Sequence, residues 1–194
     1  MVNWIWIKVL GQGSHGFVHM DLKSANILAF PQSSGCKMKL KIVDFGLSKR
    51  YEKRDDEEGV VFGLPKFRGT SKYMSPESIV LMEANNAFDI WSLGCILVKM
   101  VSGKSVWNDC KSHQELITRL LDDMETPTIP KELSKQGKDF IQKCFDRDYK
   151  QRWIVDMLLE HPYLSKETKS IYLSHQPFKI KTQPSNNGIS TILV

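Results

Sequence analysis

Two motifs that carry different chemistry lie directly side by side at residues 11–26, and this constrains the fold more than any other feature. The first, G-Q-G-S-H-G-F-V, fits G-x-G-x-x-G-x-V, and the second, H-M-D-L-K-S-A-N, fits H-x-D-L-x-x-x-N. Taken alone, the glycines have two interpretations: a hairpin turn that needs positive φ, or a loop whose backbone approaches phosphate. The motifs that follow in the chain favour the second interpretation.

Two further motifs follow in order. Asp44-Phe45-Gly46 ends a predicted strand, and Ser75-Pro76-Glu77 opens a predicted helix. The whole ordered set resembles the eukaryotic protein kinases, in which an Asp-Phe-Gly and then an Ala-Pro-Glu follow the catalytic loop. The first position of the last motif departs from that pattern, because Ser75 replaces Ala.

Finer features resemble particular kinase classes. Lys23, which closes the run D-L-K, and the segment G-T-S-K-Y-M-S-P-E at residues 69–77 are similar to the serine/threonine class. The segments K-D-F-I-Q-K-C-F-D-R-D-Y-K-Q-R-W and M-L-L-E-H-P-Y resemble the mitogen-activated protein kinase kinase kinases of plants. The resemblance therefore implies a serine/threonine kinase of that type.

The chain departs from the family at the junction of Val18 and His19. In protein kinases roughly a hundred residues separate the glycine loop from the catalytic loop, and they carry a V-A-x-K strand, a helix with its Glu partner, and the hinge that holds adenine. Here the two residues are consecutive. The resemblance thus implies that most of the N-terminal lobe is missing. Splicing, a gene-model error or a truncated product would each give this junction.

The resemblance assigns phosphoryl transfer to a few polar residues. Transfer needs a carboxylate beside the acceptor hydroxyl, oxygen ligands for Mg²⁺ and a cation near the transferred group. By resemblance, Asp21, Lys23 and Thr70 are the catalytic residues, and Asn26 and Asp44 bind magnesium. The alternative for Asp21, Asn26 and Asp44 is turn chemistry, and the alternative for Thr70 is an exposed loop position.

The same resemblance implies that the glycine loop covers ATP. Its cofactor-binding members are Gly11, Gly13, Gly16 and Val18. Two lysines, Lys8 and Lys41, could replace the missing phosphate-anchoring Lys, but we expect both to be solvated surface residues. Met20 stands where many kinases have an Arg that pairs with a phosphorylated activation loop, so switching by phosphorylation near Tyr51, Thr70 or Ser71 lacks one charged partner.

Three residues resemble the scaffold of the family rather than its chemistry. Asp89 is expected to tie the catalytic-loop backbone to a central buried helix, and Glu77 is expected to form a buried ion pair with Arg152. Removing one partner of such a pair costs about 3–5 kcal/mol, because the other charge stays buried and unpaired.

The resemblance implies an α+β fold, a truncated kinase-like domain over residues 1–164. Residues 1–18 are expected to form a β-hairpin that turns at the glycines, and residues 19–164 a mainly helical C-terminal lobe. Residues 165–194, rich in Ser, Lys, Gln, Asn and Pro, are expected to form a flexible tail.

Individual elements within the lobe follow from local patterns. A strand is expected at Met38–Val43, after a turn at Ala29–Lys37, and a loop at Leu47–Arg68. Helices are expected to begin at Pro76 and to cover Asp89–Met100, Ser112–Asp122, Gln136–Phe145 and Ile154–Glu160.

Composition narrows the class of protein. The net charge of +5 comes from 27 Lys and Arg against 22 Asp and Glu that are scattered along the chain, which argues against a nucleic-acid partner. The four cysteines form no C-x-x-C pair, so reduced thiols are expected. The apolar stretch at residues 90–101 is too short and polar to span a bilayer, so we expect no membrane partner and an intracellular, most simply cytoplasmic, protein.

Two functions from different classes remain open. The first is a serine/threonine kinase that transfers the γ-phosphoryl group of Mg-ATP to a hydroxyl of a protein substrate, for example a downstream kinase, with activity impaired by the missing Lys and Glu. The second is a non-catalytic kinase-like binding module or regulatory isoform. Its basis is that loss of the N-terminal lobe uncovers apolar surface.

Overall fold

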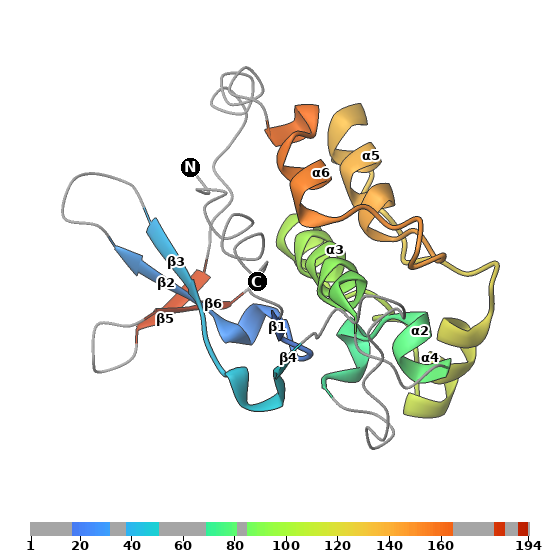
Figure 1. The fold of residues 1–194 in the computed structure, drawn as a ribbon. Coiled ribbons are helices and arrows are strands. Elements are labelled where there is room, and N and C mark those ends of the chain that lie inside the picture. The colour runs from blue at the N-terminus through green and yellow to red at the C-terminus, as the bar shows by residue number, and fades with distance from the viewer. Residues whose placement is uncertain are drawn as a thin grey trace.

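The computed structural model describes residues 17–31, 38–50, 69–80, 85–164, 181–184 and 190–193. Helices form one side of the molecule, and a small sheet of β2, β3, β5 and β6 forms the other (Figure 1). The short pair β1 and β4 lies between the two parts (Figure 1). The predicted α+β class is confirmed.

The helical part is built around α3, Asn86–Ser102, whose residues from Phe88 to Val98 are all buried. The helix begins where the Asn85 side chain accepts a hydrogen bond from the Ala87 N–H, and it ends at Gly103 with φ of 71°. The other α-helices are α2 Pro76–Val80, α4 His113–Leu121, α5 Lys135–Cys144 and α6 Val155–Leu159. Short 3-10 turns are η2 Ser24–Asn26, η3 Phe45–Leu47, η4 Ser71–Tyr73 and η5 Pro162–Leu164.

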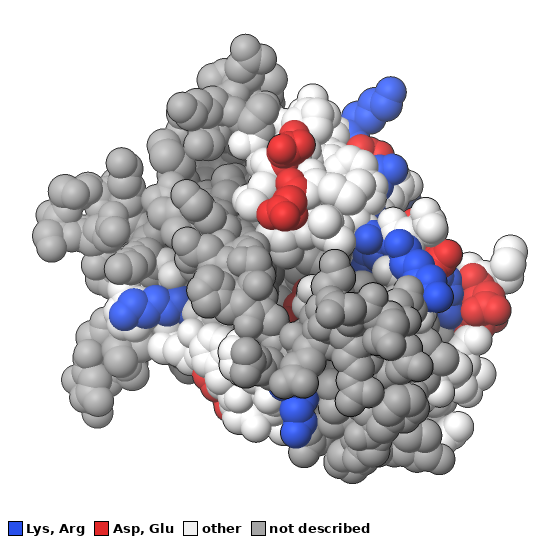
Figure 2. Space-filling view, viewed as in Figure 1, with Lys and Arg blue, Asp and Glu red and all other residues white. Residues whose placement is uncertain are grey.

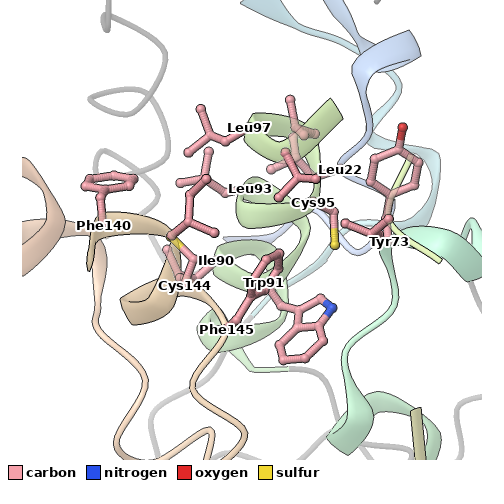
Figure 3. Close-up of a cluster of buried hydrophobic side chains, with 14 of the residues drawn as sticks. Leu22, Tyr73, Ile90, Trp91, Leu93, Cys95, Leu97, Phe140, Cys144 and Phe145 are labelled. Carbon is pink, nitrogen blue, oxygen red and sulfur yellow. The ribbon is translucent and has the colours of Figure 1, made fainter. Parts of the chain in front are cut away.

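The core forms where α3 packs against α5 and the catalytic-loop side of the chain. Figure 3 shows Trp91 of α3 beside Phe145, and their ring centroids are 5.0 Å apart. Gly94 permits this approach, because a Cβ atom at that position would lie 2.7 Å from Cε1 of Phe145. Leu22, which follows Asp21, is fully buried in the same cluster. The catalytic loop is therefore anchored in the main core by one of its own residues.

Two separate sheets accompany the helices. In the larger, β2 Ile27–Pro31 pairs antiparallel with β3 Met38–Ile42, from Ile27 opposite Ile42 to Pro31 opposite Met38. β6 Ser190–Leu193 pairs with the other edge of β2, and β5 Lys181–Pro184 follows, so the strand order is β3-β2-β6-β5. In the smaller sheet, β1 Phe17–Val18 pairs with β4 Lys49–Arg50.

The helices expected from the sequence are present, with ends that differ by a few residues. The strands differ more from expectation. The turn expected from Ala29 begins later, because β2 continues to Pro31, and the loop expected from Leu47 contains β4. Within the segment 165–194, which was expected to be a flexible tail, the structure describes two short paired strands, β5 and β6. Most of the expected hairpin at residues 1–18 lies outside the described residues.

Candidate active site

The loop from His19 to Asn26 is fixed to the helical core by one carboxylate. Oδ2 of Asp89, on α3, accepts a hydrogen bond of 2.7 Å from the His19 N–H, and Oδ1 accepts one of 3.1 Å from the Met20 N–H. These bonds confirm the expected tie between Asp89 and the catalytic-loop backbone. Burial raises the pKa of Asp89 to about 6, and the two backbone N–H groups oppose that rise.

Met20 has a left-handed backbone with φ of 66°, which is uncommon for a non-glycine residue. Its side chain is buried in a small apolar cluster with Val18, Met74 and Phe88. Gly69 passes closely over this strained peptide, because a Cβ there would lie 2.7 Å from the Met20 carbonyl oxygen. At this position, where many kinases have an Arg, the chain therefore has a buried apolar side chain.

Asp21 is the centre of a hydrogen-bonded cluster. Its Oδ2 lies 2.5 Å from Nζ of Lys23, and its Oδ1 accepts bonds from both the N–H and the hydroxyl of Thr70, at 3.0 and 2.9 Å. Nζ of Lys23 also donates to Oγ1 of Thr70 at 3.1 Å. The structure thus brings all three predicted catalytic residues together, although Thr70 comes from a distant part of the chain.

Asn26 joins the same cluster. Its Nδ2 donates to the backbone oxygen of Asp21 at 3.0 Å and approaches Oδ2 of Asp21 at 3.4 Å. These bonds use the amide nitrogen, so Oδ1, the atom that would bind a metal ion, takes no part in them. Asn26 is buried at the end of η2.

Val43, the residue before Asp44, is joined to the catalytic loop by two contacts of its backbone. The Val43 N–H donates to the Asn26 oxygen at 2.9 Å, and the Val43 oxygen lies 3.0 Å from Nε2 of His19. Because Nδ1 of His19 accepts a bond from the Asp21 N–H, the ring carries its proton on Nε2 and donates to Val43. Asp44 itself is exposed, has φ of 66°, and caps no amide of the following turn.

The predicted cofactor-binding residues have different outcomes. Gly11, Gly13 and Gly16 lie outside the described residues. Val18 is 1% exposed and faces the cluster with Met20 and Phe88. Its side chain therefore packs against Met20 of the catalytic loop. So little of it is exposed that this position disfavours the predicted contact with ATP. The physical reason is that Val18 pairs with β4 and precedes the catalytic loop directly.

The expected scaffold ion pair is present. Arg152 donates to both carboxylate oxygens of Glu77, at 2.6 and 3.0 Å, and both side chains are nearly inaccessible to solvent. Arg152 also donates to the Ala87 oxygen, which ties α2, the start of α3 and the chain before α6 together. Lys41 is exposed, as expected, with Nζ 5.1 Å from the Phe30 ring centroid.

One buried polar contact was missed by the sequence interpretation. Nζ of Lys99, on α3, donates to Oγ of Ser24 at 3.0 Å, and Oγ of Ser24 lies 3.2 Å from the Tyr73 hydroxyl. This contact joins the catalytic loop, η4 and α3. The only signal in the sequence was a lysine within the otherwise apolar run at residues 90–101, and that signal does not identify its partner.

The donor set fits magnesium better than a transition metal. Asp44 and Asn26 offer a carboxylate and an amide oxygen, and Mg²⁺ typically binds one or two protein oxygens together with water and phosphate. Among the described residues there is no group of three or more His, Cys, Asp or Glu side chains that could hold a metal ion.

Comparison with known proteins identifies the family. The protein kinase domain model matches residues 12–164, which covers the catalytic loop, Asp44 and the helical part. The chain belongs to the protein kinase family. This kinase is 37% identical over 170 residues to mitogen-activated protein kinase kinase kinase 20 of Arabidopsis thaliana, a match that covers 87% of the chain and 47% of the relative.

Two further relatives have similar names. Over 163 residues each, this kinase is 36% identical to human mitogen-activated protein kinase kinase kinase 4 and 31% identical to mitogen-activated protein kinase kinase kinase 3 of Arabidopsis thaliana. These matches cover 82% and 84% of the chain but 10% and 24% of the relatives. The chain therefore spans less than half the length of each of these relatives. The predicted resemblance to serine/threonine kinases of this type is confirmed.

Two surface properties complete the description. On the described part of the face in Figure 2, basic side chains stand at separate places, and several lie beside acidic ones. No helix among the described residues is long and apolar enough to cross a membrane.

Proposed function

We propose that this kinase binds Mg-ATP weakly and transfers its γ-phosphoryl group to a protein serine or threonine hydroxyl at a severely reduced rate. The observation that carries the proposal is the cluster of Asp21, Lys23 and Thr70 beside Asn26. The residues proposed to act on the acceptor hydroxyl are hydrogen-bonded together in this cluster. The reduced rate follows from the missing residues that would hold ATP.

Each residue of the cluster has one proposed task. Asp21 accepts the proton of the substrate hydroxyl, and Thr70 holds the Asp21 carboxylate in orientation through Oδ1. Lys23, which contacts both residues, brings a positive charge to the place where negative charge develops. Mg-ATP, when bound, supplies the phosphoryl group, and Asn26 and Asp44 are the residues that would hold the metal.

The reduced rate follows from the junction of Val18 and His19. The V-A-x-K lysine and its Glu partner, both of which must be in place in an active kinase, are not encoded between these residues. Lys41 is turned to the Phe30 ring at the surface. The relatives are named mitogen-activated protein kinase kinase kinases, so the proposed acceptor is a protein, namely another kinase of a mitogen-activated cascade.

Transfer of labelled phosphate from ATP to a generic basic protein tests the proposal. We expect the purified chain to give slow transfer that exceeds the transfer given by an Asp21→Asn control. Robust transfer that Asp44→Ala abolishes would overturn the reduced rate. A separate titration with Mg-ADP should show weak binding that Asp44→Ala weakens further, and binding that is insensitive to Asp44 would contradict the proposed metal site.

A non-catalytic function is favoured by one observation. Phe45 and Phe17 are 59% and 54% exposed beside the catalytic loop, and exposed aromatic side chains favour contact with a partner. In this alternative, the chain competes with a full-length relative for a shared partner. Addition of the purified chain would then lower substrate phosphorylation by that relative, and Phe45→Ser would relieve the effect. Equal inhibition by both chains would argue against docking through Phe45.

A further inference from the structure

The C-terminal strand β6 is paired to the sheet at a place close to the catalytic loop. Thr191 lies opposite Leu28 and Ser190 lies opposite Ala29, on the edge of β2 that β3 does not occupy. β5 covers the outer edge of β6, with Lys181 opposite Leu193 and Pro184 opposite Ser190. Figure 1 shows β5 and β6 in red beside the blue strands of the N-terminal half.

β6 also contacts η2, Ser24–Asn26, the turn that closes the catalytic loop. β2 begins at Ile27, directly after this turn, so a strand on the β2 edge approaches Asn26 along the backbone. A segment docked at this edge therefore lies close to Asn26, the proposed metal-binding residue. Any segment that leaves the edge changes what surrounds Asn26.

The β2 edge requires an occupant for a physical reason. An unpaired edge presents a row of free N–H and C=O groups, and such an edge pairs readily with any extended segment. The occupying sequence S-T-I-L is uncharged and rich in β-branched residues, which suits a strand in the middle of a sheet. Only two residue pairs join β6 to β2, whereas five join β2 to β3, so β6 is the more easily released of the two neighbours.

We propose that the edge of β2 beside the catalytic loop is a docking site for an extended peptide, and that the chain's own Ser190–Leu193 occupies it as an intramolecular strap. Tethering favours the intramolecular occupant, because a segment of the same chain has an effective concentration of about millimolar. The inference goes beyond the proposed phosphoryl transfer and does not depend on nucleotide binding.

Hydrogen–deuterium exchange of the full chain tests the pairing. Thr191→Pro removes a backbone N–H from the strand between β2 and β5, whereas Thr191→Val keeps the N–H and the β-branched shape. We expect the amides of residues 27–30 that face β6 to exchange several-fold faster in Thr191→Pro than in Thr191→Val or the unchanged chain. Amides of α3 should stay equally protected, as a control for folding. Equal exchange at the amides that face β6 in all three chains would overturn the proposal.

A labelled peptide that reproduces residues 181–193 tests the docking site itself. Its binding is compared between the unchanged chain and Thr191→Pro. We expect the peptide to bind Thr191→Pro roughly tenfold more tightly than the unchanged chain, because the tethered strand competes in the latter. The same peptide with Pro at its Thr191 position should not bind. Equal affinity for both chains would overturn the docking site.

The same exchange experiment separates the chain's own strand from that of a second copy. Protection of the amides that face β6 should be independent of protein concentration if the strand belongs to the same molecule. Protection that disappears on dilution would mean that a second copy supplies the strand, and would overturn the intramolecular assignment. None of these measurements contains nucleotide, so their failure is distinct from failure of the proposed phosphoryl transfer.

Discussion

Met20 and Asp44 have the same unusual backbone conformation in two opposite environments. Both have φ of 66°. Met20 is buried, its N–H is bonded to Asp89, and Gly69 closes over its carbonyl oxygen. Asp44 is exposed and caps no amide of its own turn. The backbone of Met20 is thus held by bonds and packing at the residue itself, whereas the contacts around Asp44 are made by its neighbours. Val43 bonds to Asn26 and His19, and the Phe45 ring lies 4.9 Å from the His19 ring.

This difference shows which of the two backbones the fold itself holds. A strained backbone persists only where its surroundings offset the cost of about 1–3 kcal/mol. The surroundings of Met20 do so by packing and hydrogen bonds within the chain. At Asp44 the carboxylate faces solvent, which suits a residue whose partner is a ligand. The surroundings of Met20 are therefore fixed by the fold, whereas the Asp44 side chain is exposed and makes no capping bond to its own turn.

The largest effect on the free energy of unfolding should come from the buried ion pair between Glu77 and Arg152. Glu77→Gln leaves the Arg152 guanidinium buried without its charged partner, so we expect a loss of about 3–5 kcal/mol in the free energy of unfolding. Asp109→Asn is the control, because Asp109 pairs with Arg119 while 73% exposed, and its loss should cost at most about 1 kcal/mol. Denaturant unfolding measures both, and similar losses would show that burial does not govern these pairs.

The next effect concerns pH and the anchor of Met20. Because burial raises the pKa of Asp89 from 3.8 to about 6, the folded chain holds the proton more tightly than the unfolded chain. The stability from this proton is fully present below 3.8 and is lost as pH rises through about 6. Compared with Asp89→Asn, which cannot ionise, the unchanged chain should lose up to roughly 3 kcal/mol between about pH 4 and pH 7.

Unfolding of both chains at the two pH values checks this expectation, because titrating groups that do not interact with Asp89 cancel in the difference between the chains. A difference that does not change with pH would place the titration of Asp89 outside this window. A change of opposite sign would mean that the bonds from His19 and Met20 outweigh burial.

A smaller effect is expected within the Asp21 cluster. Thr70→Ala removes the hydroxyl that bonds to Asp21 and Lys23, which should cost about 1 kcal/mol of unfolding free energy. Thr70→Ser keeps the hydroxyl and should stay close to the unchanged chain. If Thr70→Ala and Thr70→Ser lower the unfolding free energy equally, the loss comes from the methyl group that both remove. The hydroxyl would then not fix Asp21.

The smallest effect on stability is expected at Asp44. Asn tolerates the left-handed backbone, so Asp44→Asn should change the unfolding free energy by less than about 0.5 kcal/mol. The same substitution should weaken Mg-ADP binding measured by calorimetry, since an amide replaces a carboxylate ligand. A large loss of stability would show that Asp44 is fixed by the fold, and the contrast with Met20 would be lost.

The order of motifs in the sequence predicted much of the candidate site. The cluster of Asp21, Lys23 and Thr70, the anchor at Asp89, and the Glu77–Arg152 pair all appear as expected, because each belongs to a motif with a definite spacing. Val18 fits two positions in the motifs: the end of the glycine pattern and the strand that leads into the catalytic loop. Only the pairing with β4 distinguishes them.

The sequence by itself determined the family, the helices and the residues of the Asp21 cluster, since helical periodicity and short motifs are local properties of the chain. Tertiary structure alone decided that Val18 is buried, that Lys99 reaches Ser24, and that β6 pairs with β2. The physical reason is that strand pairing and buried polar contacts depend on partners far away in sequence, and no local pattern identifies those partners.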